Sequence, residues 1–80
     1  MTTIIGIGIT NRKDIAKKVQ DVLTEFGCDI KTRLGLSDYK ETECSYNGLI
    51  LVDVPNREKA LLLETELKNI DNVVIKEMEF

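Results

Sequence analysis

The sequence predicts one α+β sandwich of four strands and two helices. Two segments carry apolar residues at helical spacing, and each follows an asparagine suited to cap a helix. Four further runs carry the alternating or fully apolar patterns of strands. The chain has 80 residues, of which 42% are hydrophobic and 31% charged, so we expect a single globular domain over residues 1–80.

The first strand and the first helix are predicted from the N-terminal third. Residues 4–9 read Ile-Ile-Gly-Ile-Gly-Ile, with isoleucine on every second position. Asn11 offers a helix N-cap, and Gly27 is a natural stop after the helix. The apolar stripe between them is Ile15, Val19, Val22, Leu23 and Phe26.

The middle of the chain predicts two more strands. Residues 28–36 alternate apolar and polar side chains, with Cys28 expected as a small core residue. A polar connection over 37–47 follows, and then a nearly all-apolar strand over 48–54. Pro55 ends that strand because proline has no N–H to donate to a sheet.

The last third completes the order βαββαβ. Asn56 caps the second helix, and the pair 71–72 turns the chain into a final strand over 73–78. The core stripe of the second helix is Ala60, Leu63, Leu67 and Ile70. This order predicts the split-βαβ, ferredoxin-like sandwich, with an antiparallel sheet of order 4-1-3-2 and both helices on one face.

Strand parity predicts which residues face the helices. On the helix side we expect Ile5, Ile7, Ile9, Ile30, Leu34, Ile50, Val52, Val54, Val73 and Ile75. The opposite face then has an apolar centre, with charged residues, Arg33 among them, mostly on the outer strand. Its members are Ile4, Gly6, Gly8, Thr10, Asp29, Lys31, Arg33, Leu49, Leu51, Asp53, Val74, Lys76, Met78 and Phe80.

Such an apolar face predicts self-association, since monomers rarely expose contiguous apolar patches beyond a few hundred Å². The alternative is a tolerated exposed patch in which the leucines are only strand formers. The predicted interface consists of Ile4, Gly6, Gly8, Leu49, Leu51, Val74, Met78 and Phe80.

Four residues are candidates to bind a ligand. Thr10, Asn11 and Arg12 stand where the first strand meets the first helix, so free amides and a cation could bind an anion or carboxylate there. The simpler interpretation is a capping asparagine beside a solvated arginine. Arg33 could bind an anion or form an ion pair between subunits, and a solvated strand charge explains it equally well.

Several classes of function are excluded or disfavoured by composition. Without histidine, the usual zinc, copper and nickel ligand sets and the Ser-His-Asp triad are missing. Because no general base accompanies a nucleophile, we expect no catalytic residue and no enzyme. We also expect no metal and no cofactor. A degenerate enzyme using Arg33, Asp53 and the acidic 37–47 connection is the rival. Cys44 in that connection is a candidate reactive thiol.

Partners and location are also constrained. The net charge of −3 argues against nucleic acid, which requires a basic surface. No run approaches the roughly 18 apolar residues of a membrane span, and no basic leader precedes the first strand. We therefore expect a cytoplasmic protein that binds no membrane.

Three segments resemble one known family. Residues 30–36 (IKTRLGL), 48–52 (GLILV) and 72–80 (NVVIKEMEF) are similar to the regulators of the iron-only hydrogenase system, and the likeness spans essentially the whole chain. The resemblance implies an ACT-like fold, related in shape to the C-terminal domain of nickel-responsive repressors. The repressors' nickel ligands and DNA-reading segment have no counterpart here.

The resemblance also implies a function. It implies a non-catalytic, regulatory or ligand-sensing module that works as a homodimer or homotetramer, with a hydrogenase-maturation or regulatory protein as a further partner. Two alternatives stay open: a structural partner-binding subunit without a small ligand, and an amino-acid-binding ACT domain.

Overall fold

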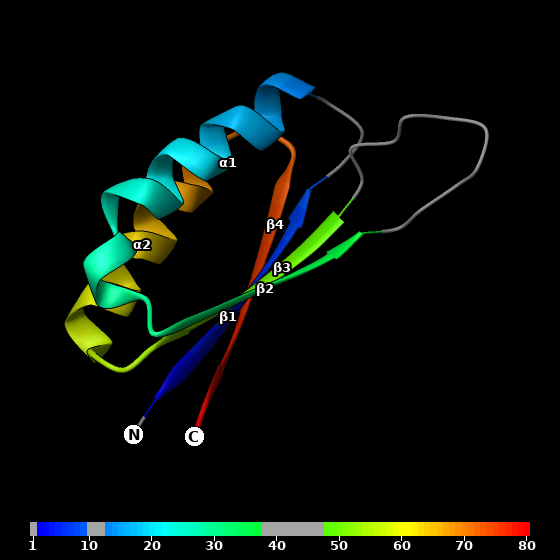
Figure 1. Cartoon of the computed structure of the whole chain (residues 1–80). Coiled ribbons are helices and arrows are strands. Elements are labelled where there is room, and N and C mark those ends of the chain that lie inside the picture. The colour runs from blue at the N-terminus through cyan, green and yellow to red at the C-terminus, as the bar shows by residue number, and fades with distance from the viewer. Residues whose placement is uncertain (1, 10–12, 38–47) are drawn as a thin grey trace.

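The computed structural model of the chain describes residues 2–9, 13–37 and 48–80. The elements are β1 (Thr3–Ile9), α1 (Lys13–Glu25), a short 3₁₀ helix η1 (Gly27–Asp29), β2 (Thr32–Ser37), β3 (Gly48–Val54), α2 (Arg57–Lys68) and β4 (Val73–Glu79). The strands form one antiparallel sheet in the order β2-β3-β1-β4, and both helices cover the same face of it (Figure 1). The predicted ferredoxin-like order is confirmed.

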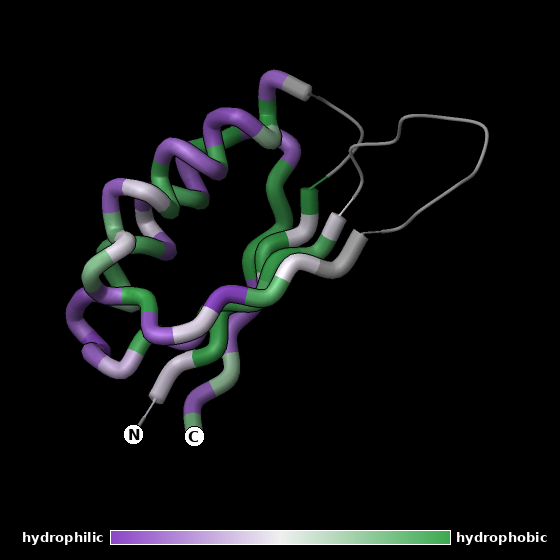
Figure 2. Tube along the Cα trace, in the orientation of Figure 1, coloured by the Kyte–Doolittle hydropathy of each residue, from purple (hydrophilic) through white to green (hydrophobic). Residues whose placement is uncertain are grey.

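The core lies between the sheet and the two helices. Alternate residues of β1 are buried, and Ile5 and Ile7 are completely inaccessible to solvent. Fully burying an aliphatic side chain of this size stabilises the fold by about 1.5–3 kcal/mol. The helices contribute Ile15, Val19 and Leu23 from α1 and Ala60, Leu63 and Leu67 from α2. Figure 2 shows hydrophobic residues along the centre of the strands and mixed hydropathy along the helices.

Two asparagines shape the second half as predicted. The side chain of Asn56 accepts a hydrogen bond from the backbone N–H of Lys59 at 3.2 Å, which caps α2. Asn72 adopts a left-handed backbone with φ of 65°, a conformation that asparagine tolerates better than most residues. This residue turns the chain from α2 into β4.

The second strand begins later than predicted. Residues 27–29 form η1, in which the N–H of Asp29 donates to the carbonyl of Phe26 at 2.9 Å, and β2 starts only at Thr32. The prediction that Cys28 is a core residue was wrong, because this residue lies in η1 and is exposed. The alternating pattern over 28–36 did not distinguish a helical turn from the first residues of a strand.

The predicted parity of β2 was also wrong. The N–H of Lys31 donates to the carbonyl of Asp53 at 2.8 Å, while Thr32 is the ladder partner of Asp53. Lys31 and Thr32 thus both lie opposite Asp53, as in a β-bulge. Because strand side chains alternate, one extra residue moves every later side chain of β2 to the other face of the sheet. Leu34 therefore faces away from the helices, and Arg33 faces toward them.

The helices of the described residues include none that is both long enough and apolar enough to cross a membrane.

Candidate functional site

The face of the sheet turned away from α1 and α2 is the candidate site, and we call it the open face. The register of the four strands arranges it in three rows, each running across β2, β3, β1 and β4. These rows are Thr32, Asp53, Ile4 and Met78; then Leu34, Leu51, Gly6 and Lys76; then Leu36, Leu49, Gly8 and Val74.

Large apolar side chains on this face are exposed to solvent. Leu34 is 51% exposed, Leu49 41% and Met78 57%. The helix-side residues of β1 and β3, by contrast, are buried. An apolar surface that spans all four strands favours burial against a partner, since each leucine gains free energy when it leaves water.

All eight residues of the predicted interface lie on the open face. Seven of them stand in the three rows. The eighth, Phe80, exchanges two backbone hydrogen bonds with Thr2, at 2.8 and 3.1 Å, and so continues the ladder between β1 and β4 past Met78. The structure adds Leu34 to this face, which the parity argument had placed on the helix side.

Gly6 and Gly8 leave bare backbone in the middle of this face. A Cβ built on Gly6 would lie 3.5 Å from Cδ2 of Leu51, and one built on Gly8 would lie 3.5 Å from Cβ of Val74. These are ordinary contact distances, and neither glycine has a positive φ. Packing within the chain would therefore accept alanine, although glycine inside a strand costs roughly 0.5–1 kcal/mol. Glycine here suits close approach by something outside the chain.

A shallow hollow lies over Gly6. Its volume is about 310 Å³, and its lining is Ile4, Gly6, Leu51, Lys76, Glu77 and Met78. Most of the lining is apolar, and Lys76 supplies a cation at its edge. The hollow can accept an apolar side chain from a partner.

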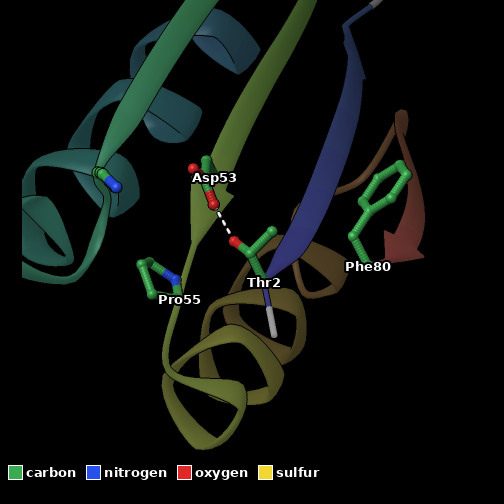
Figure 3. A pocket seen from close by; sticks show the side chains of 5 residues that line it. Thr2, Asp53, Pro55 and Phe80 are labelled. Carbon is green, nitrogen blue, oxygen red and sulfur yellow. Dashed lines mark hydrogen bonds between the residues drawn. The ribbon is translucent and has the colours of Figure 1, made fainter.

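A second hollow, of about 350 Å³, lies at the end of the sheet where both termini are found (Figures 1 and 3). It is lined by Thr2, Lys31, Asp53, Pro55 and Phe80. The hydroxyl of Thr2 donates to Oδ1 of Asp53, and Figure 3 shows these two side chains pointing toward each other. Phe80 stands across β1 from them, on the β4 side. The hydrogen bond from Thr2 orients the Asp53 carboxylate.

The predicted ligand residues do not meet on the open face. Thr10, Asn11 and Arg12 lie outside the described residues, as does Cys44. Arg33 lies on the helix side, where its Nη2 donates to Oε1 of Gln20 in α1. The prediction that Arg33 lies opposite the helices was wrong, because the bulge before β2 inverts its parity.

An arginine-centred cluster on the helix side escaped the sequence analysis. Arg57 at the start of α2 donates two hydrogen bonds to Glu77, at 3.0 and 3.1 Å. It also lies 3.0 Å from a carboxylate oxygen of Glu79 and donates to the hydroxyl of Thr3. The alternate glutamates at the end of β4 were the available signal, but their partner lies 20 residues away in sequence.

Glu64 lies buried beside this cluster, with only 7% of its surface exposed, and its Oε2 has no hydrogen-bond partner among the described residues. Burial, and then its hydrogen bond with Glu77, raise the pKa of Glu64 from 4.5 to about 7. Hydrogen bonds from Arg57 and then Glu64 lower the pKa of Glu77 to about 2. The folded chain thus favours neutral Glu64. This stabilisation is present below pH 4.5 and is lost as pH rises through about 7.

The described ranges contain no group of three or more Cys, Asp or Glu side chains placed to hold a metal ion. The carboxylates of Glu77 and Glu79 are instead paired with Arg57. The cluster ties α2 to the edge strand β4.

Comparison with known proteins identifies the fold. No family model matches the chain, and no curated protein matches its sequence. An uncharacterized protein from Thermotoga maritima has a similar structure, with a TM-score of 0.81 and 22% identity, over 96% of this chain and 92% of that one.

Two more distant structures share the architecture. A protein from Jannaschia sp. CCS1, described as a dimeric ferredoxin-like protein of unknown function, aligns with a TM-score of 0.58 and 8% identity over 100% of both chains. A protein from Bacteroides thetaiotaomicron, described as a possible oxidoreductase, aligns with a TM-score of 0.56 and 11% identity over 99% of this chain and 97% of that one. At these identities the likeness shows the ferredoxin-like fold alone.

Proposed function

We propose that the chain is a non-catalytic module that acts as an oligomer, with two copies pairing through their open faces. The observation that carries the proposal is the exposed apolar surface of the open face, with bare glycine backbone at its centre. Pairing would bury the exposed leucines twice over, once in each copy. The dimeric description of the Jannaschia protein, which has the same fold, supports this choice of partner.

The absence of catalysis is part of the proposal. The carboxylates of Glu77 and Glu79 are held by Arg57, and Glu64 beside them is buried against the core, as expected for groups that stabilise the fold. The Bacteroides thetaiotaomicron protein is described as a possible oxidoreductase. Activity of this chain with a redox cofactor, measured by turnover, would contradict the proposal.

A regulatory or ligand-sensing role is the finer part of the proposal. It rests on the resemblance of residues 30–36, 48–52 and 72–80 to the iron-only hydrogenase system regulators, whose ACT-like domains it would share. A hydrogenase-maturation or regulatory protein would then be the further partner. A thermal-shift screen with amino acids, nucleotides and metal ions tests sensing: a saturable shift supports it, and silence favours a structural subunit.

Sedimentation velocity tests oligomerisation. We expect a dimer across the micromolar range, with dissociation on dilution. A chain that remains monomeric at high micromolar concentration would contradict the proposal.

A further inference from the structure

We propose that two reciprocal ion pairs, between Lys76 of each copy and Asp53 of the other, set the register of the paired open faces. This inference rests on the proposed function. It names the residues that specify one relative orientation of the two copies, among the many in which two apolar faces can stack.

Asp53 and Lys76 are the charged residues of the three rows. Within the described part of the chain neither forms an ion pair, and Thr2 donates its hydrogen bond to only one of the Asp53 oxygens. A charge buried in an interface without a partner is costly. Two facing copies therefore need to match these charges with each other.

The two residues do not pair within one copy in the described part of the chain. Asp53 lies on β3 opposite Ile4, and Lys76 lies on β4 opposite Gly6, so β1 separates the two residues. With strands roughly 4.8 Å apart and a rise of roughly 3.4 Å per residue, their backbones are about 12 Å apart. The hollow over Gly6 lies between them.

Symmetry turns one contact into two. In a two-fold dimer, if Lys76 contacts Asp53 of the partner copy, then Asp53 contacts Lys76 of that copy. The axis must then pass over the midpoint between the two residues. Because they flank β1 symmetrically and stand two residues apart along it, this midpoint lies on β1 between Ile4 and Gly6.

The midpoint coincides with the place where close approach is easiest. Around a two-fold axis in the plane of the interface the two sheets face each other directly, and Gly6 presents no side chain there. The leucine beside it, Leu51, leans to within 3.5 Å of where a Cβ of Gly6 would stand and lines the hollow there, which can accept an apolar side chain of the partner copy. The charge match and the glycine position thus select the same axis.

Lys31 is the other cation near Asp53. It lines the terminal hollow with Asp53, but it lies at the margin of the sheet, at the bulge before β2, and outside the three rows. In the arrangement proposed, Lys31 stays on the rim of the interface. Lys31→Ala should therefore leave the dissociation constant of the dimer within about twofold of the wild-type value, because rim charges contribute little to affinity.

A charge-swap experiment tests the pairing by sedimentation equilibrium. Asp53→Lys and Lys76→Asp each place like charges opposite one another, so each should raise the dissociation constant roughly tenfold or more. The double variant restores opposite charges and should return the constant to near the wild-type value. Asp53→Asn keeps an acceptor for Thr2 and removes only the charge, so a weakened dimer that remains folded by circular dichroism supports the pairing even if Asp53→Lys does not fold.

The existing surface pair of α1 supplies the matched control. Lys17 and Asp21 lie 3.6 Å apart and are both well exposed, so swapping their charges should leave the dimer unchanged. If the wild type is a dimer and both Asp53→Asn and Lys76→Asp leave its dissociation constant unchanged, this pairing alone is overturned. The same holds if the single charge swaps weaken the dimer but the double variant does not restore its affinity. A monomeric wild type would overturn the proposed function, and this inference with it.

Discussion

Replacing Leu34 by lysine tests the open face at the residue whose position the bulge decides. Leu34 is 51% exposed and stands beside Leu51 in the central row of that face. A lysine there keeps a long aliphatic stem but places a charge at the proposed interface. In an isolated copy the charge would remain in solvent, so the fold should tolerate it.

The magnitude follows from the exposed fraction. Fully burying a leucine contributes about 1.5–3 kcal/mol, and about half of the Leu34 surface remains to be buried on pairing, which corresponds to roughly 0.8–1.5 kcal/mol per copy. In a symmetric dimer both copies lose this burial free energy, so dimerisation is weakened by about 1.5–3 kcal/mol. This corresponds to a roughly 10- to 150-fold rise in the dissociation constant. Desolvation of the lysine adds to this value.

Leu62 offers a closely matched control. It is 53% exposed, but it lies on α2, on the opposite side of the molecule from the open face. Leu62→Lys and Leu34→Lys are compared with the wild type by sedimentation equilibrium, and thermal unfolding checks the fold of each. We expect Leu34→Lys to weaken the dimer and Leu62→Lys to leave it unchanged.

Two results would refute this reasoning. If both variants dimerise like the wild type, the open face is not the interface. If Leu62→Lys alone weakens the dimer, the copies pair through their helices instead.

Three further predictions concern stability and the centre of the sheet. Glu64→Gln removes a carboxyl group whose ionisation destabilises the fold as pH rises through about 7. In urea unfolding, the free energy of unfolding of the variant should therefore exceed that of the wild type by about 1–3 kcal/mol at pH 8 and equal it near pH 4. Equal pH dependence of both proteins would disprove this assignment. Asn56→Ala removes the cap of α2 and should cost about 1 kcal/mol of unfolding free energy, whereas Asn56→Asp should cost little. Gly6→Val should leave the chain folded by circular dichroism and weaken the dimer in sedimentation, and an unaffected dimer would place the contact elsewhere.

Much of the fold was predictable because it depends on local patterns. Each of three local patterns involves only neighbouring residues along the chain: the alternating isoleucines of β1, the Asn56 cap and the apolar stripe of α2. Their order along the chain then leaves few ways to form a sheet with helices on one face. Nine of the twelve positions in the three rows, and Phe80 beyond them, were predicted on the same reasoning.

The failures share a non-local cause. Whether Leu34 or Arg33 faces the helices depends on the bulge opposite Asp53, which forms only when β2 pairs with β3. The cluster around Arg57 likewise requires α2 to lie beside the end of β4. Neither pairing leaves a periodic trace in the sequence.

The sequence by itself therefore determined the βαββαβ order, the buried stripes and the existence of an apolar surface that one chain cannot cover, since periodicity and composition carry these. Only the tertiary structure decided which side chains of β2 belong to that surface. A single extra residue before β2 moved Arg33 to the helix side and Leu34 to the open face, and so left Asp53 and Lys76 as the charges of its three rows. The physical reason is that strand side chains alternate with a period of two, so their facing depends on register, and register is a property of paired strands.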